Sequence, residues 1–211
     1  MNRRFLAALT LVVTLFAGIS GAASAAPVKI LAFGDSLIAG YGLPEGDGFV
    51  PQLQQALEKM GREVTVINGG LSGDTTAGGL SRLDWMLAEK PDMVILELGA
   101  NDMLRGLSPD EARANLDATI QRIKESGAKL LLAGMLASRN MGADYQSKFD
   151  AIYPDLARAH EVALYPFFLD GVAARPELNQ QDGLHPTKDG VAVIVSNILP
   201  HVTKLLDTPE S

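Results

Sequence analysis

Short apolar runs and longer amphipathic segments alternate along this chain. Four of the runs are rich in valine, isoleucine and leucine and are bounded by Gly, Asn or Asp, which is typical of buried strands. These runs cover residues 28–33, 63–67, 92–98 and 129–134, and a weaker fifth run covers residues 162–166. The pattern therefore predicts up to five strands separated by helix-length segments.

The clearest helix signal lies in residues 108–127. Ser108 suits the N-cap, Pro109 suits the first helical position, and Glu111 completes a capping box with Ser108. Gly127 is a stop signal at the other end of the segment. We therefore expect a helix between the third and the fourth strand.

Four further segments have helical spacing, at residues 48–61, 75–90, 144–161 and 186–206. Pro154 lies inside the third of these segments. Because proline removes a backbone hydrogen bond from a helix interior, we expect a kink or a break there.

Strand and helix in alternation at this spacing predict right-handed βαβ units, and hence a parallel sheet with helices on both faces. The sequence has no internal repeat, low-complexity block or linker, so residues 27–211 are expected to form one α/β domain. Ligands of such sheets bind beyond the carboxyl ends of the strands. The segments just after each strand are therefore the ones to search for chemistry.

The first 26 residues differ in kind from the rest. A basic start with Arg3 and Arg4 precedes an uncharged apolar stretch, and small residues with an Ala23-Ser24-Ala25 pattern follow, as in a secretory signal peptide. As a helix the apolar stretch would span about 24 Å, less than the ~30 Å of a bilayer core. We expect export to the periplasm or beyond, without stable membrane insertion after cleavage; an uncleaved anchor is the alternative.

Composition narrows the class of partner. The formal net charge is -7 at pH 7, and 47% of the residues are hydrophobic, enough for a full core. Nucleic acids and anionic membranes are disfavoured as partners because both require a basic face. The chain has no cysteine, which excludes disulfides, thiolate metal ligands and a lipidated amino terminus. We expect a monomer that acts on a small molecule.

Four polar segments fall at the expected edge of the sheet. GDSL follows the first strand, SGD the second and GAND the third, and DGLHP precedes the last helix. A serine becomes a good nucleophile only when a base removes its proton, and histidine is the usual base. Of the three histidines, His160 and His201 lie in helical segments, whereas His185 lies in a turn. Ser36 and His185 are therefore the candidate nucleophile and base.

Two further requirements of acyl transfer are met at the same edge. Asp182 precedes His185 by three residues, a spacing that lets its carboxylate reach the imidazole and fix its tautomer. The backbone amides of Ser36 and Gly73 and the side-chain amide of Asn101 are candidate donors for an oxyanion. Each residue taken alone suits an ordinary turn or cap, but their occurrence together favours a catalytic site.

In this order FGDSL, SGD, GAND and DGLHP resemble the four sequence blocks of the SGNH, or GDSL, hydrolases. The resemblance extends from Val28 to about Leu206 and is nearest to the bacterial periplasmic multifunctional esterases and arylesterases. It implies a three-layer α/β/α fold with a five-stranded parallel sheet in the order 2-1-3-4-5.

The resemblance also implies the role of each candidate. Ser36 would be the nucleophile, His185 the general base and then acid, and Asp182 the residue that orients His185. The oxyanion hole would consist of Ser36, Gly73 and Asn101. No metal or cofactor is implied.

The expected substrates are aryl esters and short to medium acyl esters, with thioesters and lysophospholipids as further possibilities. Met135, Leu136 and Met141 follow the fourth strand, and we expect them to line an apolar acyl groove with residues 43–49 and 165–172. Methionine fits irregular apolar surfaces. Ordinary packing of these segments is the alternative.

Other functions remain open. A carbohydrate deacetylase or an acyltransferase would use the same residues. A metal-dependent phosphoesterase would use Asp35, Asp102, Asp182 and His185, although such sites normally combine several histidine and aspartate ligands. A non-catalytic binding module on the same fold is a third alternative.

Three residues near these blocks are expected to be structural. Trp85 stands at helical spacing with three leucines, which predicts a core position. Asp35 is expected to be a hydrogen-bonding residue of the turn rather than an acid in the reaction. Arg105 is expected to steady the loop after Asn101 rather than to face an anionic substrate.

Overall fold

The structure is a computed structural model that describes residues 26–209. The predicted signal peptide, residues 1–26, lies outside the described residues except for its last residue. Within the described range no helix combines the length and the apolar character needed to span a bilayer.

Within residues 26–209, five parallel strands form one sheet in the order β2-β1-β3-β4-β5. The strands are β1 (Val28–Gly34), β2 (Val64–Gly70), β3 (Met93–Glu97), β4 (Lys129–Ala133) and β5 (Ala163–Tyr165). The predicted strands and the order 2-1-3-4-5 are therefore confirmed. β3 lies at the centre and all five of its residues are buried, as expected of a strand covered on both faces.

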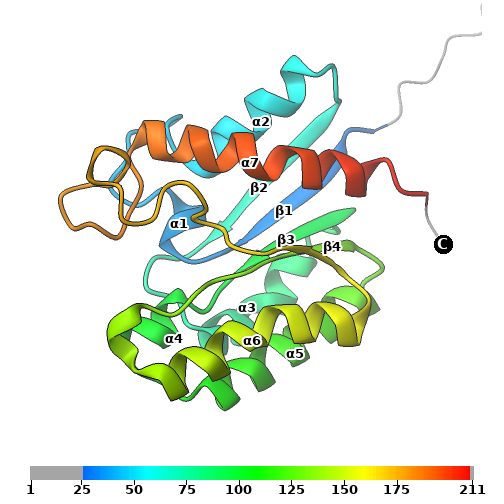
Figure 1. The fold of residues 1–211 in the computed structure, drawn as a ribbon. Coiled ribbons are helices and arrows are strands. Elements are labelled where there is room, and N and C mark those ends of the chain that lie inside the picture. Colours follow the sequence, from blue (N-terminus) through cyan, green and yellow to red (C-terminus); the bar gives the residue numbers. More distant parts are fainter. Residues whose placement is uncertain (1–25, 210–211) are drawn as a thin grey trace, which may run out of the picture.

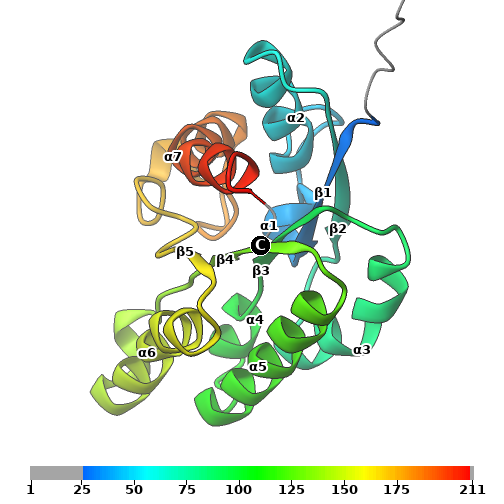
Figure 2. The same cartoon turned by 90° about the vertical axis from the view of Figure 1, so that its right-hand side faces the viewer.

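Helices cover both faces of the sheet (Figures 1 and 2). On one face lie α2 (Phe49–Lys59) and α7 (Lys188–Leu206), which pack against each other. On the other face lie α3 (Thr76–Leu87), α5 (Pro109–Glu125) and α6 (Ala143–His160), with α5 between the other two. The result is the expected three-layer α/β/α arrangement.

The sequence patterns did not predict the short helices in the loops. α1 (Ser36–Ala39) follows β1 after one residue, and α4 (Ala100–Leu104) begins shortly after β3. The 3₁₀ turns η1 (Arg139–Met141) and η2 (Pro176–Leu178) lie in later loops. A single turn is too short to show amphipathic periodicity.

The predicted caps of α5 are present. Ser108 is the N-cap and its hydroxyl accepts a hydrogen bond from the Glu111 amide at 3.4 Å, with Pro109 at the start of the helix. Gly127 follows the end of α5 at a φ of +83°, in the left-handed region that favours glycine.

Of the kink or break expected at Pro154, the break does not occur. Helix α6 continues from Ala143 to His160 with Pro154 in its interior. Tyr153 and Leu156, on either side of the proline, are almost fully buried. Burial of these side chains holds the helix together despite the hydrogen bond that the proline cannot donate.

The expectation that Trp85 lies in the core is wrong. Its side chain is 77% exposed, whereas Leu83 and Met86 of the same helix are buried. Residues two apart on a helix point to nearly opposite sides, so burial of Leu83 turns Trp85 outward.

Candidate active site

The four polar segments meet at the carboxyl ends of the strands, at the side of the molecule where α1 and the loop before α7 lie in Figure 1. Ser36 is the first residue of α1, and its neighbour Asp35 caps that helix by accepting a hydrogen bond from the Leu37 amide at 3.0 Å. Ser36 is only 9% exposed. The strand-to-helix turn thus holds the serine at the edge of the sheet.

A line of hydrogen bonds connects the three predicted triad residues. The distance from Ser36 Oγ to His185 Nε2 is 2.8 Å, and that from His185 Nδ1 to Asp182 Oδ2 is 2.7 Å. With a proton on Nδ1 donated to Asp182, Nε2 is free to accept the proton of the Ser36 hydroxyl. The three-residue spacing brings Asp182 to the imidazole, as expected.

Backbone amides hold Asp182 in its ionised form. Its Oδ1 accepts hydrogen bonds from the amides of Leu184 at 2.9 Å and His185 at 3.0 Å. These two amides, followed by the His185 ring, lower the pKa of Asp182 to about 2. Asp182 is therefore a carboxylate across the physiological pH range.

Tyr41 and Gln180 fix the position of His185, and neither was singled out in the sequence. The Tyr41 ring lies against the imidazole with 4.5 Å between ring centroids. The Gln180 side chain donates to the carbonyls of Tyr41 at 2.8 Å and Pro186 at 3.0 Å. These contacts join the loop after α1 to the turn that carries the histidine. A glutamine in a loop gives no sequence signal for such a bridge.

Gly73 and Asn101 line the same cavity as Ser36. Gly73 has a φ of +82°, a conformation that favours glycine. Arg105 Nη2 donates to the Gly73 carbonyl at 2.7 Å and so ties the end of α4 to the turn at Gly73, a contact of the structural kind expected for it. Asn101 Nδ2 donates to Asp35 Oδ2 at 3.0 Å, which leaves its second N–H available.

Arg82, which was not singled out in the sequence, also contributes to this edge. Its guanidinium donates to Asp74 at 2.7 Å and to the Gly34 carbonyl at 2.9 Å, and it lies 4.2 Å from the centroid of the Phe33 ring. It therefore ties the end of β1 to the loop after β2.

Two buried carboxyl groups lie directly behind the serine. Asp35 is 1% exposed and Glu97, the last residue of β3, is completely buried. Burial raises the pKa of both groups, and that of Glu97 is also raised by the charge of Asp35. Asp35 behaves as the hydrogen-bonding residue of the turn that the sequence predicts, whereas Glu97 was missed because its strand resembles any other buried strand.

The cavity beside Ser36 has a volume of about 660 Å³. Its apolar walls include Leu37, Met103, Met135, Leu136, Phe167 and Leu169. Met135 and Leu136 thus lie where predicted, and Phe167 and Leu169 come from the predicted segment 165–172. Met141 is not among the lining residues and packs against the core instead. The segment 43–49 also contributes no lining residue.

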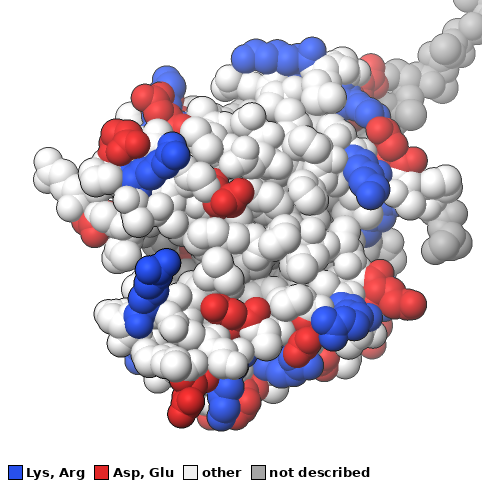
Figure 3. All heavy atoms as spheres, viewed as in Figure 1, with Lys and Arg blue, Asp and Glu red and all other residues white. Residues whose placement is uncertain are grey.

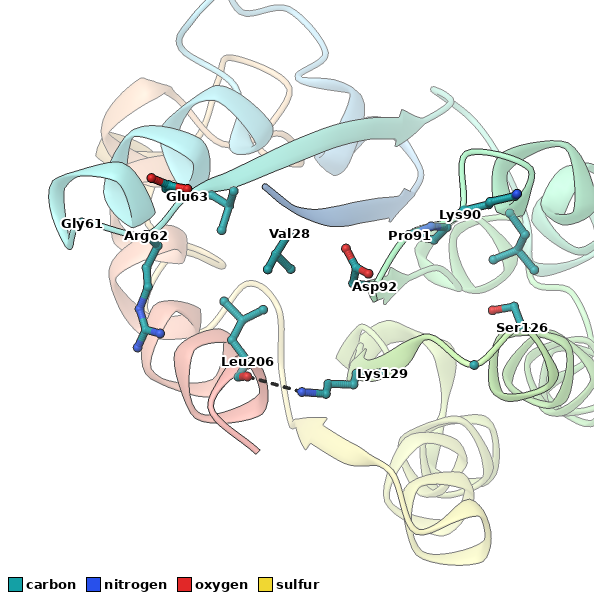
Figure 4. A pocket seen from close by; sticks show the side chains of 13 residues that line it. Val28, Gly61, Arg62, Glu63, Lys90, Pro91, Asp92, Ser126, Lys129 and Leu206 are labelled. Atoms are coloured by element: carbon teal, nitrogen blue, oxygen red, sulfur yellow. Dashed lines mark hydrogen bonds between the residues drawn. The ribbon is translucent and has the colours of Figure 1, made fainter. Parts of the chain in front are cut away.

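A larger cavity of about 810 Å³ lies at the opposite end of the sheet (Figure 4). Several of its polar groups have partners elsewhere in the chain. Lys129 Nζ donates to the Leu206 carbonyl at 3.3 Å, and Asp92 accepts from the Lys29 amide at 2.7 Å. Its one serine, Ser126, donates to the Ile123 carbonyl. The chemistry therefore concentrates at the smaller cavity.

The residues named for a metal-dependent phosphoesterase do not converge. Both oxygens of Asp102 accept hydrogen bonds from Thr76, from its amide at 2.8 Å and its hydroxyl at 2.7 Å. Asp102 thereby anchors the start of α3 rather than facing His185. Among residues 26–209, no three His, Asp or Glu side chains are grouped so that they could hold a metal ion.

On the face shown in Figure 3, acidic and basic side chains are interspersed.

Comparison with known proteins agrees with the prediction of an ester hydrolase. A family model described as the GDSL-like Lipase/Acylhydrolase family matches residues 32–193. An arylesterase of Vibrio mimicus is 44% identical over 88% of this chain and 93% of its own length. Esterase TesA of Pseudomonas aeruginosa is 40% identical over 86% of this chain and 91% of its own. The Escherichia coli K12 protein called thioesterase 1/protease 1/lysophospholipase L1 is 38% identical over 79% of each chain.

Solved structures of esterases are also similar to this chain in sequence and in fold. AlinE4, an SGNH-hydrolase family esterase, is 48% identical with a TM-score of 0.72, over 86% of this chain and 98% of that chain. The psychrotrophic esterase EstA from Pseudoalteromonas, in a structure inhibited by monoethylphosphonate, is 32% identical with a TM-score of 0.81, over 85% and 99% of the two chains.

The lowered pKa of Asp182 makes a prediction about stability. Because its folded-state pKa is about 2 and its ordinary value is 3.8, Asp182 stabilises the folded chain above about pH 4, and this contribution is lost as the pH falls toward 2. In urea unfolding, the wild type should exceed Asp182→Asn in free energy of unfolding at about pH 6, and the gap should narrow by about pH 3. Asp170→Asn, at an exposed carboxylate, is the control. A gap that does not change with pH contradicts the prediction.

Proposed function

Because this chain belongs to the GDSL-like Lipase/Acylhydrolase family, we propose that it hydrolyses carboxylic esters through an acyl-enzyme formed on Ser36. The chain is a carboxylic ester hydrolase, as its arylesterase and esterase relatives are. The observation that carries the assignment of residues is the line of hydrogen bonds from Asp182 through His185 to Ser36, which ends at an apolar cavity.

In the first half of the reaction, Ser36 Oγ adds to the ester carbonyl carbon while its proton passes to His185 Nε2. The carbonyl oxygen becomes an oxyanion that accepts hydrogen bonds from the amides of Ser36 and Gly73 and from Asn101 Nδ2. When the intermediate collapses, the alcohol leaves with the proton held by His185, and the acyl group stays on Ser36.

In the second half, His185 removes a proton from water as the water attacks the acyl-enzyme, and it passes this proton to Ser36 Oγ when the bond from Ser36 to the acyl carbon breaks and the carboxylic acid is released. Asp182 holds the His185 tautomer throughout and stabilises the imidazolium that forms in each half. Its lowered pKa keeps it negatively charged while His185 gains and loses its proton.

The shape of the cavity supports substrates with an apolar acyl or aryl group. Its volume of about 660 Å³ lies in the range of small-molecule sites, and its walls are mainly apolar. Met135 and Leu136 lie on these walls, and Leu136 is 45% exposed, so it can contact a bound chain. Aryl esters and short to medium acyl esters fit this description, with thioesters and lysophospholipids as further substrates suggested by the name of the Escherichia coli relative.

A substrate panel tests the proposed function. The panel contains p-nitrophenyl esters of increasing chain length, acyl-CoAs, lysophospholipids, an acetylated sugar and an alcohol acceptor. Ser36→Ala should abolish turnover of every substrate that the wild type hydrolyses, and a serine-directed phosphonate should do the same, whereas EDTA should leave turnover intact. Residual Ser36→Ala activity near that of the wild type would exclude Ser36 as the nucleophile.

Asn101→Ala tests the oxyanion hole. Loss of one donor should lower kcat by about 10²- to 10³-fold, because the bond strengthens only as the oxyanion forms. Circular dichroism should show that the variant is folded. Asn140→Ala, at an exposed asparagine outside the cavity lining, is the matched control and should not lower kcat. Wild-type turnover by Asn101→Ala would remove Asn101 from the mechanism.

We also propose that the chain is exported, that its leader is cleaved after Ala25 or Ala26, and that it then acts as a monomer. The basic, apolar and small-residue parts of residues 1–26 support export. Native mass spectrometry of protein purified from the periplasm tests all three claims, since it should give one chain that begins at Ala26 or Pro27. An intact amino terminus or a dimer mass would contradict the corresponding claim.

A further inference from the structure

The carboxyl pair behind Ser36 has no place in the mechanism described so far. Glu97 ends the central strand and is completely buried. Its Oε2 accepts a hydrogen bond from the Asp35 amide at 3.3 Å. Its Oε1 is buried and has no hydrogen-bond partner among the described residues. A charged carboxylate with a bare oxygen in such a position is costly, and a proton on the group removes most of that cost.

Gly34, the last residue of β1, lies against both the main chain and the carboxyl group of Glu97. A Cβ at Gly34 would clash with the Glu97 main-chain carbonyl and with Ile38 Cγ1, and it would lie 2.6 Å from Glu97 Oε2. Gly34 has no positive φ, so these close approaches, rather than the backbone conformation, account for the glycine. The first residue of the GDSL block is therefore one whose small size lets Glu97 and Ile38 pack behind the serine.

Asp35 connects this acid to the candidate oxyanion hole. One of its oxygens accepts from the Leu37 amide at 3.0 Å, and the other accepts from Asn101 Nδ2 at 3.0 Å. The second N–H of Asn101 is then the one available to an oxyanion. Because a charged acceptor holds a donor more firmly than a neutral one, a negative charge on Asp35 fixes the orientation of the Asn101 amide.

The groups around the pair favour a single negative charge. Within residues 26–209, neither Asp35 nor Glu97 forms an ion pair with a lysine or arginine. Arg82 is near but binds Asp74 and the Gly34 carbonyl. The charge of His185 acts on Asp35, and both Asp35 and Glu97 act in turn on Tyr153. Tyr153 donates its hydroxyl to the Leu98 carbonyl at 2.8 Å.

The pKa directions agree with this picture. Burial raises the pKa of Glu97 well above its ordinary value, and the charge of Asp35 and a hydrogen bond to it raise it further. Burial also raises the pKa of Asp35, but hydrogen bonds from Leu37, Glu97 and Asn101 act in the opposite direction. The proton therefore belongs with Glu97 and the charge with Asp35.

We propose that Glu97 is a positioning residue for the ester hydrolysis proposed above: it holds a proton shared with Asp35, so that one negative charge on Asp35 fixes the Asn101 amide for the oxyanion. The side chain of Glu97 does not touch the substrate. Glu97 instead determines the charge of Asp35, and Asp35 orients the Asn101 amide. Loss of the shared proton at alkaline pH places two charges in one buried site and loosens this arrangement.

Infrared spectroscopy tests the proton without reference to turnover. At neutral pH the wild type should show the C=O stretch of a protonated, buried carboxyl group, and Glu97→Gln should lack that band. Glu125→Gln, at an exposed position of α5, should retain the band. Absence of the band from the wild type, or its survival in Glu97→Gln, overturns the proposal.

Kinetics tests the effect on the oxyanion hole. Glu97→Ala should lower kcat by about tenfold with little change in KM. This is the effect expected when the transition state loses stabilisation equal to that of one hydrogen bond. Glu97→Gln should recover most of this loss, because its amide can donate to Asp35 as the protonated acid does. Failure of glutamine to recover kcat, or an equal rise in KM, overturns the proposal.

The pH profile separates positioning from a merely structural role. The alkaline decline of wild-type kcat should move to higher pH in Glu97→Gln, which has no proton to lose. An unshifted profile overturns the proposal. Ser36→Ala distinguishes this failure from failure of the proposed function: esterase activity in Ser36→Ala contradicts the function alone, whereas the infrared band is expected in Ser36→Ala and tests the shared proton by itself.

Discussion

The 2.8 Å hydrogen bond between Ser36 Oγ and His185 Nε2 joins two residues that are 149 positions apart. Neither segment could hold this geometry alone, because one is a single helical turn and the other is a loop. The parallel sheet solves the problem by placing β1 next to the central strand β3 and by packing α7 against β4, β5 and α2. The interiors of β1 and β3 are apolar and almost free of solvent contact, and this burial keeps the two segments aligned.

Side chains that bind backbone carbonyls supply the remaining rigidity. Arg82 holds the end of β1, Arg105 holds the turn at Gly73, and Gln180 joins the histidine turn to the loop after α1. Each of these hydrogen bonds joins two segments that are far apart in the sequence. The catalytic edge is therefore a set of cross-linked segments whose geometry is fixed in advance, as preorganised catalysis requires.

The sequence predicts the parts of this protein that repeat a regular pattern. The strands appear as apolar runs, helix α5 carries its caps in its sequence, and the four polar blocks fall where a parallel sheet brings them together. Contacts between distant residues are harder to predict. Trp85 is exposed to solvent because Leu83, on the opposite side of α3, is buried in the core. Helix α6 continues through Pro154 because Tyr153 and Leu156 are buried. Glu97 is one acid in an apolar run, and only the fold shows that it lies against Asp35. Met135 and Met141 look alike in the sequence, yet only Met135 reaches the cavity.

The position of the chain ends has a practical consequence. Val28 at the start of β1 and Leu206 at the end of α7 line the same hollow, at the end of the sheet opposite the cavity beside Ser36 (Figures 1 and 4). A support or fusion partner joined at either end of the folded domain is therefore held away from the mouth through which an ester enters. The enzyme can be immobilised through the residues just before β1 or just after α7, with its catalytic edge facing the solution.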